Sequence, residues 1–209
     1  MRKRRSFVIA FTGSHCVGKT TLMNELAKLL KKDGMRVKTI PEVARKIPKE
    51  KLGTFEGQKE VSKLIRNCIE ECINNGVDIV LVDRSPFDTI YYTIFYMIDK
   101  QWTLKELSSV YDLIYDSYLD TLELIDIHVF VMRSDTVKLV DNGFRLYDER
   151  SRTIVDIIAK LLNVLNCDSI PTLFVLPSGN VEKDARFIYD MITPYITVSY
   201  THLTLPTKA

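Results

Sequence analysis

The sequence lacks long hydrophobic runs, closely paired cysteines and a large net charge. No stretch approaches the roughly 18 consecutive apolar residues that span a membrane as a helix, so we expect no membrane partner. The four cysteines include no C-x-x-C pair, and no set of Cys and His residues stands at zinc spacing. This pattern indicates a reducing, cytoplasmic setting. A formal net charge of only +2 over 209 residues gives no argument for a nucleic-acid partner.

A basic cluster, Arg2-Lys-Arg-Arg5, precedes the first apolar run, as it would in a secretion signal. That run, residues 7–11, is short, and a glycine-containing loop interrupts it. We therefore interpret it as a buried strand and the basic cluster as a solvated tail. The composition, 46% hydrophobic and 27% charged, suits one globular domain, which we place at residues 1–197. Residues 198–209 lack periodicity and resemble a translated sequencing-adaptor end, so we set them outside the fold as a non-native tail.

The stretch Gly13-Ser-His-Cys-Val-Gly-Lys-Thr-Thr21 fits the phosphate-binding pattern G-x-x-x-x-G-K-[ST]. An apolar run precedes it and a helical pattern follows it, which argues against a glycine turn that matches by chance. Glycines permit backbone conformations that turn successive N–H groups inward at a helix N-terminus. We predict that Lys19 reaches the β- and γ-phosphates and that Thr20 ligates Mg²⁺. The predicted nucleotide contacts are Gly13, Ser14, His15, Cys16, Val17, Gly18, Lys19, Thr20 and Thr21.

Strand-type and helix-type patterns alternate along the rest of the chain. Strands are expected at residues 7–11, 35–40, 77–82, 126–132 and 172–176, and helices at 19–33, 54–75, 103–124, 153–166 and 181–192. Residues 43–53 are expected to be irregular, and residues 87–98 form an aromatic-rich stretch whose side chains we assign mostly to the core. Strands that alternate with helices predict an α/β fold with a parallel sheet and helices on both faces.

Two carboxylates follow predicted strands at the edge where ligands bind in α/β sheets. Asp83 ends the third strand, where a carboxylate can hold Mg²⁺; a helix cap for the segment from Pro86 is the alternative. Glu42 ends the second strand, where it can serve as general base or metal ligand. An ordinary exposed glutamate at this position is an equally open interpretation.

An arginine-rich segment follows the fourth strand and contains Arg145, Arg150 and Arg152. Arginines supplied by a lid neutralise the charge that builds on the transferred phosphoryl group, so we predict a catalytic role for all three. A solvated loop paired locally with Asp148 and Glu149 is the alternative. His15 and His128 are assigned structural roles.

In their order and spacing these motifs resemble the P-loop nucleoside and nucleotide kinases, most closely the ATPase-like kinase domain of nicotinamide-riboside-kinase-type regulators. The segments that carry the resemblance are Phe11–Leu22, Pro41-Glu-Val-Ala-Arg45, Val82-Asp-Arg-Ser-Pro-Phe-Asp-Thr89 and Asn142-Gly-Phe-Arg145 to Arg152. The resemblance spans residues 6–194 and implies a five-stranded sheet in the order 2-3-1-4-5. It also implies ATP with Mg²⁺ and transfer to a small-molecule acceptor.

The Asp-Arg-Ser motif also looks like that of deoxynucleoside and thymidylate kinases, in which the acidic residue and the arginine lie near the acceptor. The acceptor contacts expected from these segments are Glu42, Arg45, Arg84 and Phe87. Glu-Val-Ala-Arg replaces the Glu-Pro-type segment of deoxynucleoside kinases, and no base-reading residue carries over. The acceptor therefore stays open.

The sequence as a whole predicts an ATP- and Mg²⁺-dependent kinase acting on a nucleoside-, nucleotide- or nicotinamide-riboside-like acceptor. The catalytic residues of this hypothesis are Lys19, Glu42, Asp83, Arg145, Arg150 and Arg152, with Thr20 and Asp83 at the metal. A rival hypothesis is a P-loop ATPase switch or regulatory module that acts on a protein partner. No Asn-Lys-x-Asp guanine signature is present, which favours ATP over GTP. The sequence does not determine the oligomeric state.

Overall fold

The computed structural model describes residues 6–137 and 148–204, with side chains described as far as residue 198. Its centre is a five-stranded sheet in the order β2-β3-β1-β4-β5, in which every neighbouring pair is parallel. This order and direction confirm the predicted sheet. The strands are β1 Phe7–Thr12, β2 Val37–Ile40, β3 Ile79–Asp83, β4 Ile127–Val131 and β5 Thr172–Val175.

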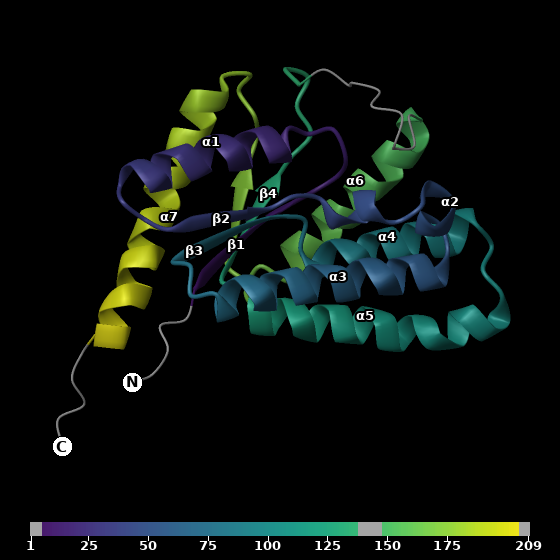
Figure 1. Cartoon of the computed structure of the whole chain (residues 1–209). Coiled ribbons are helices and arrows are strands. Elements are labelled where there is room, and N and C mark those ends of the chain that lie inside the picture. Colours follow the sequence, from purple (N-terminus) through teal and green to yellow (C-terminus); the bar gives the residue numbers. More distant parts are fainter. Residues whose placement is uncertain (1–5, 138–147, 205–209) are drawn as a thin grey trace.

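Helices cover both faces of the sheet, as predicted (Figure 1). The helical elements are α1 Lys19–Lys32, η1 Val43–Lys46, α2 Lys49–Leu52, α3 Phe55–Asn74, α4 Pro86–Asp99, α5 Leu104–Leu124, α6 Glu149–Leu165 and α7 Val181–Thr204. Among the described residues, no helix is long and apolar enough to cross a membrane.

One face of the sheet is closed by α1 and α7 alone. Alternate residues of β1, including Ile9 and Phe11, point to this face and pack against Leu26 of α1 and Ile188 of α7. All four side chains are completely buried, as the alternation of a strand between two covered faces requires. This layer is apolar and buried, so it supports the site without lining the cavity described below.

The opposite face carries α3, α4 and α6, with α5 as a further layer outside them (Figure 1). Val8 and Ala10 of β1 pack against α3, whereas Phe130 of β4 packs against Tyr91 of α4 and Val155 of α6. The outer helix α5 is fixed through Ser117, whose hydroxyl shares a 3.0 Å hydrogen bond with that of Ser62 in α3. Because several helices cover this face of the sheet, a cavity can form between them.

Three expectations about the elements need correction. The aromatic stretch forms a helix, α4, because Ser85 and Asp88 make a complete capping box and Pro86 occupies its first turn. Residues 43–53 are not wholly irregular, since they include η1 and α2. The last helix does not end near Ile192 but continues through Pro194 to Thr204, and so takes in part of the segment set aside as a tail.

Candidate functional site

The phosphate loop lies between β1 and α1 and depends on two glycines with positive φ. Gly18 is the N-cap of α1 with φ +92°, and Gly13 has φ +126°. A Cβ on Gly13 would lie 2.5 Å from the carbonyl oxygen of Val131, which no side chain tolerates. The loop thus packs closely against the end of β4. The N-terminus of α1 provides a concave site for an anion.

Lys19 folds over this loop from the first turn of α1. Its ammonium group donates to the carbonyl oxygens of Gly13 at 3.1 Å and Ser14 at 2.6 Å, and the residue is only 3% exposed. An ammonium carries three donors and no acceptor, so this position holds a positive charge inside the loop. Lys19 therefore lies within the predicted phosphate loop, and its contact with phosphates stays a prediction.

Thr20 and Asp83 meet across the loop at the carboxyl ends of β1 and β3. The Thr20 hydroxyl donates a hydrogen bond to Oδ2 of Asp83. The other carboxylate oxygen, Oδ1, is buried and has no hydrogen-bond partner among the described residues. A hydroxyl beside an incompletely paired carboxylate is an oxygen donor set that fits Mg²⁺, which takes few protein ligands and keeps water and phosphate oxygens. Thr20 and Asp83 are therefore the residues that fit the metal.

Two side chains of α6 form hydrogen bonds with residues in the middle of the loop. Asp156 accepts a hydrogen bond from the Ser14 hydroxyl at 3.1 Å, and Arg152 donates to the carbonyl oxygen of Cys16 at 3.3 Å. Arg152 is 4% exposed, and its Nε has no hydrogen-bond partner among the described residues. Arg150, in contrast, is exposed, and Arg145 lies outside the described residues. Of the three predicted arginines, the structure brings Arg152 to the loop.

A buried ionic cluster connects the loop to the second strand end. Arg84 has φ +84° and donates through Nε to Oε1 of Glu42 at 2.7 Å. Its Nη1 lies 3.4 Å from both the Gly13 carbonyl oxygen and Oδ1 of Asp88. The second oxygen of Glu42 accepts from Arg45 at 3.1 Å. Glu42 is therefore buried and faces the loop rather than solvent, which decides against the exposed-glutamate alternative.

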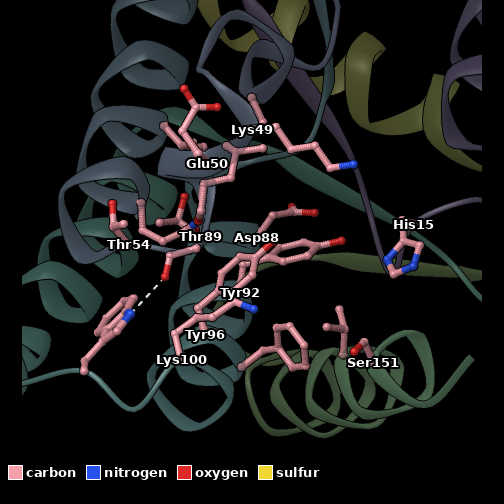
Figure 2. A pocket seen from close by; sticks show the side chains of 18 of the residues that line it. His15, Lys49, Glu50, Thr54, Asp88, Thr89, Tyr92, Tyr96, Lys100 and Ser151 are labelled. Carbon is pink, nitrogen blue, oxygen red and sulfur yellow. Dashed lines mark hydrogen bonds between the residues drawn. The ribbon is translucent and has the colours of Figure 1, made fainter. Parts of the chain in front are cut away.

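A cavity of about 620 Å³ opens beside this cluster (Figure 2). Polar groups near the loop, Glu42, Arg84 and His15, line one part of it, whereas aromatic and aliphatic side chains from α3, α4, α6 and the segment before α5 line much of the rest. The aromatic lining residues are Tyr92, Phe95, Tyr96 and Trp102. Cavities of this size, mostly apolar with a few fixed polar groups, are typical of small-molecule sites.

Two features of the cavity are compatible with a bound ligand. The Thr89 hydroxyl is buried in its wall and has no hydrogen-bond partner among the described residues. Figure 2 shows the Lys49 side chain pointing from α2 to the side of the cavity where His15 lies. Unpaired buried hydroxyls are rare because each costs free energy unless a ligand or water satisfies it.

The structure separates two predicted acceptor contacts from this cavity. Phe87 is buried in an apolar cluster with Ile90 and Ile170 and packs against His128, so it does not line the wall. Arg45 is not among the described residues that line the cavity, and it contacts Glu42. The position of Phe87 follows from where α4 begins, because the residue lies in the first turn of this helix and packs against His128 of β4. The periodicity of the sequence alone does not reveal this orientation.

Several side chains at the site were not predicted from the sequence. Asp88 had a readable signal, since Ser-Pro-Phe-Asp is a capping box that fixes it at the first turn of α4. His15, predicted as a nucleotide contact, also lines the cavity, for which it was not predicted. Asp156 and Trp102 had no local signal, because both reach the site only through the packing of distant helices.

The fold and the site define a P-loop domain of the nucleoside and nucleotide kinase-like class. A family model described as an AAA domain matches residues 8–183, and the chain belongs to that family. None of the curated proteins matches the chain by sequence.

Solved structures of a deoxyadenosine kinase and of the NadR protein share the fold. A deoxyadenosine kinase from M. mycoides with bound dCTP is 16% identical with a TM-score of 0.65, over 90% of this chain and 100% of that chain. The same enzyme with dCMP and a flexible dCDP gives 15% identity and a TM-score of 0.62, with the same coverage. The NadR protein in complex with NAD and AMP-PNP is 17% identical with a TM-score of 0.68; the match covers 94% of this chain and about half, 51%, of NadR. At these identities the likeness shows the fold alone.

Proposed function

We propose that this protein is an ATP- and Mg²⁺-dependent kinase that transfers the γ-phosphoryl group to a small molecule bound in the cavity. The observation that carries the proposal is the position of the cavity. It begins at His15, inside the phosphate loop, and includes Glu42 and Arg84, so donor and acceptor sites are contiguous. An ATPase that only signals to a protein partner needs no enclosed acceptor site.

The charged residues have separate roles in this proposal. The amides of the loop and Lys19 hold the donor phosphates, and Arg152 lies where it can neutralise charge on the transferred group. Glu42 lines the cavity beside Arg84, so its carboxylate lies where it can take the proton of an acceptor hydroxyl. Glu42 thus serves as the general base, and Arg84 fixes its orientation.

Thr20 and Asp83 would hold Mg²⁺, which would supply charge neutralisation at the donor phosphates. Asp83 contributes in two ways without the metal. Its Oδ2 fixes the Thr20 hydroxyl, and its Oδ1 is a buried acceptor at the carboxyl end of β3. Arg145 and Arg150 remain candidates for the closing of the site around the phosphates.

The acceptor class is a compact molecule with a planar ring and a hydroxyl or phosphate, such as a nucleoside, a nucleotide or nicotinamide riboside. The aromatic wall made by Tyr92, Tyr96 and Trp102 supports a ring, since aromatic side chains bind planar groups over large apolar areas. The structural likeness to a deoxyadenosine kinase and to NadR supports the same class. Four free cysteines support the cytoplasmic setting.

A nucleotide-dependent switch acting on a protein partner is the alternative, favoured by the AAA domain family. The two are separated by measuring ATP consumption with and without a panel of nucleosides, nucleotides and nicotinamide riboside. The kinase proposal expects turnover that rises with one acceptor class, accompanied by the phosphorylated acceptor. Turnover indifferent to every acceptor would favour the switch.

A further inference from the structure

Tyr91 of α4 touches the phosphate loop where the loop leaves β1. Its hydroxyl oxygen lies 3.2 Å from the Gly13 amide nitrogen and 3.1 Å from the Gly13 carbonyl oxygen, with the Thr12 hydroxyl at 3.4 Å. The residue is completely buried. It is thus the side chain of α4 that contacts both polar groups of the first loop residue.

Asp88, one turn before Tyr91, decides which of these hydrogen bonds form. A tyrosine hydroxyl has one proton, and the competing acceptors are the Asp88 carboxylate and the Gly13 carbonyl oxygen. The carboxylate is the stronger acceptor, and the Gly13 carbonyl already receives the Lys19 ammonium. The hydroxyl therefore donates to Asp88 and accepts from the Gly13 amide, which gives a directed chain from the carboxylate to the loop.

Burial, and next the charge of Asp88, raise the pKa of Tyr91 well above its ordinary value. The hydroxyl consequently keeps its proton throughout the pH range of biochemistry. Asp88 is itself fixed, since Oδ2 accepts from the Ser85 amide at 2.9 Å and from the Ser85 hydroxyl at 3.1 Å. The chain of bonds is therefore anchored in the capping box of α4.

Gly13 needs such an anchor. Its φ is +126°, and a Cβ at this position would lie 2.5 Å from the Val131 carbonyl oxygen, so the position requires glycine, a residue with wide backbone freedom. A fixed first peptide presents the following amides to the phosphates without an ordering cost on binding.

We propose that Tyr91 and Asp88 are a positioning pair that fixes the first peptide of the phosphate loop from the wall of the acceptor cavity. Asp88 lines that cavity, so the same carboxylate contacts both halves of the site. The positioning itself depends only on nucleotide binding by the loop; its link to the acceptor rests on the proposed kinase function.

The first test needs no ligand. The chain has eight glycines, so a spectrum of protein labelled with ¹⁵N only at glycine is simple. In Tyr91→Phe the Gly13 amide loses its acceptor, so its resonance shifts and its hydrogen exchange accelerates at least tenfold. Tyr118→Phe, at a half-buried tyrosine of α5 remote from the loop, leaves the Gly13 resonance in place.

The second test measures the affinity for AMP-PNP with Mg²⁺ by titration calorimetry, together with Tm. Tyr91→Phe and Asp88→Asn each weaken binding about tenfold, and the double variant weakens it by no more than about tenfold, because both act through one chain of bonds. If the double variant weakened AMP-PNP binding about a hundredfold, the two residues would act independently, and the proposed positioning pair would be overturned. A role in packing alone would lower Tm and leave the affinity of folded protein unchanged, which would also overturn it.

If Tyr91→Phe does not fold, Asp88→Asn keeps the tyrosine and carries both tests, and an unchanged Gly13 amide with unchanged affinity then refutes the inference. Failure of the kinase proposal is distinguishable. A protein that binds AMP-PNP and shows the tenfold losses, yet phosphorylates no acceptor, sustains the positioning pair and contradicts only the proposed function.

Discussion

The phosphate loop takes its polar groups from the nine consecutive residues 13–21, whereas the acceptor cavity takes its lining from α2, α3, α4, α5 and α6. Backbone amides and one lysine at fixed spacing make the first site, so its geometry is local. Side chains from distant segments make the second, so its geometry depends on how helices pack. In the proposed kinase, the local site binds the nucleoside triphosphate, and the site assembled from packing determines what receives the phosphate.

The two sites meet in very few residues. Glu42, Arg84 and Asp88 contact one another and face both the loop and the cavity. Changes in the loop should therefore alter donor binding, changes in the cavity should alter acceptor binding, and changes at the junction should alter transfer.

The largest effect is expected from Lys19→Ala, which removes the charge held between the Gly13 and Ser14 carbonyl groups. We expect kcat/KM for ATP to fall on the order of 10³-fold, about 4 kcal/mol, because transfer depends on charge and positioning. Steady-state kinetics of ATP consumption measure it. Lys31→Ala, at an exposed position near the end of α1, is the matched control. Near-normal turnover in Lys19→Ala would contradict the assignment of the donor site.

Acid should destabilise the half of the molecule that contains the cavity through His128. Burial lowers the pKa of this imidazole to about 4 in the folded state, against 6.5 in the unfolded chain. The unfolded state therefore binds the proton first. Stability is complete above about pH 6.5 and falls, by about 3 kcal/mol in total, as the pH drops through 4.

Denaturant unfolding between pH 7 and pH 4 measures this loss. His128→Phe keeps an aromatic ring against Phe87 and should reduce the dependence of the free energy of unfolding on pH. An equally steep slope in His128→Phe would assign the acid sensitivity to carboxylates instead.

At the junction, Glu42→Gln should lower transfer about 10²-fold and leave the affinity for AMP-PNP within twofold of wild type. The amide keeps the shape of the side chain but is not a base, so only the proton transfer suffers. Kinetics with the acceptor identified by screening, alongside calorimetry, separate the two readouts. Glu60→Gln, an exposed position of α3, is the control. Equal losses in transfer and nucleotide affinity would place Glu42 in the donor site.

The two described arginines of the α6 segment should differ. Arg152 reaches the Cys16 carbonyl oxygen from a buried position, whereas Arg150 is exposed. We expect Arg152→Ala to reduce kcat roughly 30-fold and Arg150→Ala less than threefold, because a buried guanidinium near the phosphates acts in a low dielectric. Single-turnover measurements compare them. A larger loss of kcat in Arg150→Ala than in Arg152→Ala would show that α6 moves when nucleotide binds.

The smallest effect is expected from Thr89→Val, which removes an unpaired hydroxyl from the cavity wall. Without ligand the variant should be up to about 1 kcal/mol more stable, since an unsatisfied buried polar group is lost. The KM for the acceptor should rise about fivefold and the KM for ATP should stay constant. Thr93→Val, a buried threonine of α4 outside the cavity lining, should show the stability gain without the change in KM. An unchanged acceptor KM in Thr89→Val would show that this hydroxyl does not contact the acceptor.

The sequence predicted the local site and the sheet much better than the cavity. The loop was readable because its chemistry depends on residue types at fixed spacing, and the parallel sheet because its strands are short apolar runs between helical patterns. Helix α4 was missed because its aromatic residues pack on several sides and give no clear period. Phe87 was misplaced for a related reason: one residue's face on a helix depends on the start of that helix, which here is set by the capping box at Ser85.

The account depends most on phosphoryl transfer to a molecule in the cavity. Its most direct test follows the label from ATP radiolabelled at the γ-phosphoryl group during incubation with Mg²⁺ and the panel of nucleosides, nucleotides and nicotinamide riboside. We predict label in one acceptor class, in wild-type protein and not in Lys19→Ala. Label released only as inorganic phosphate, at the same rate with every acceptor and with none, would contradict the account.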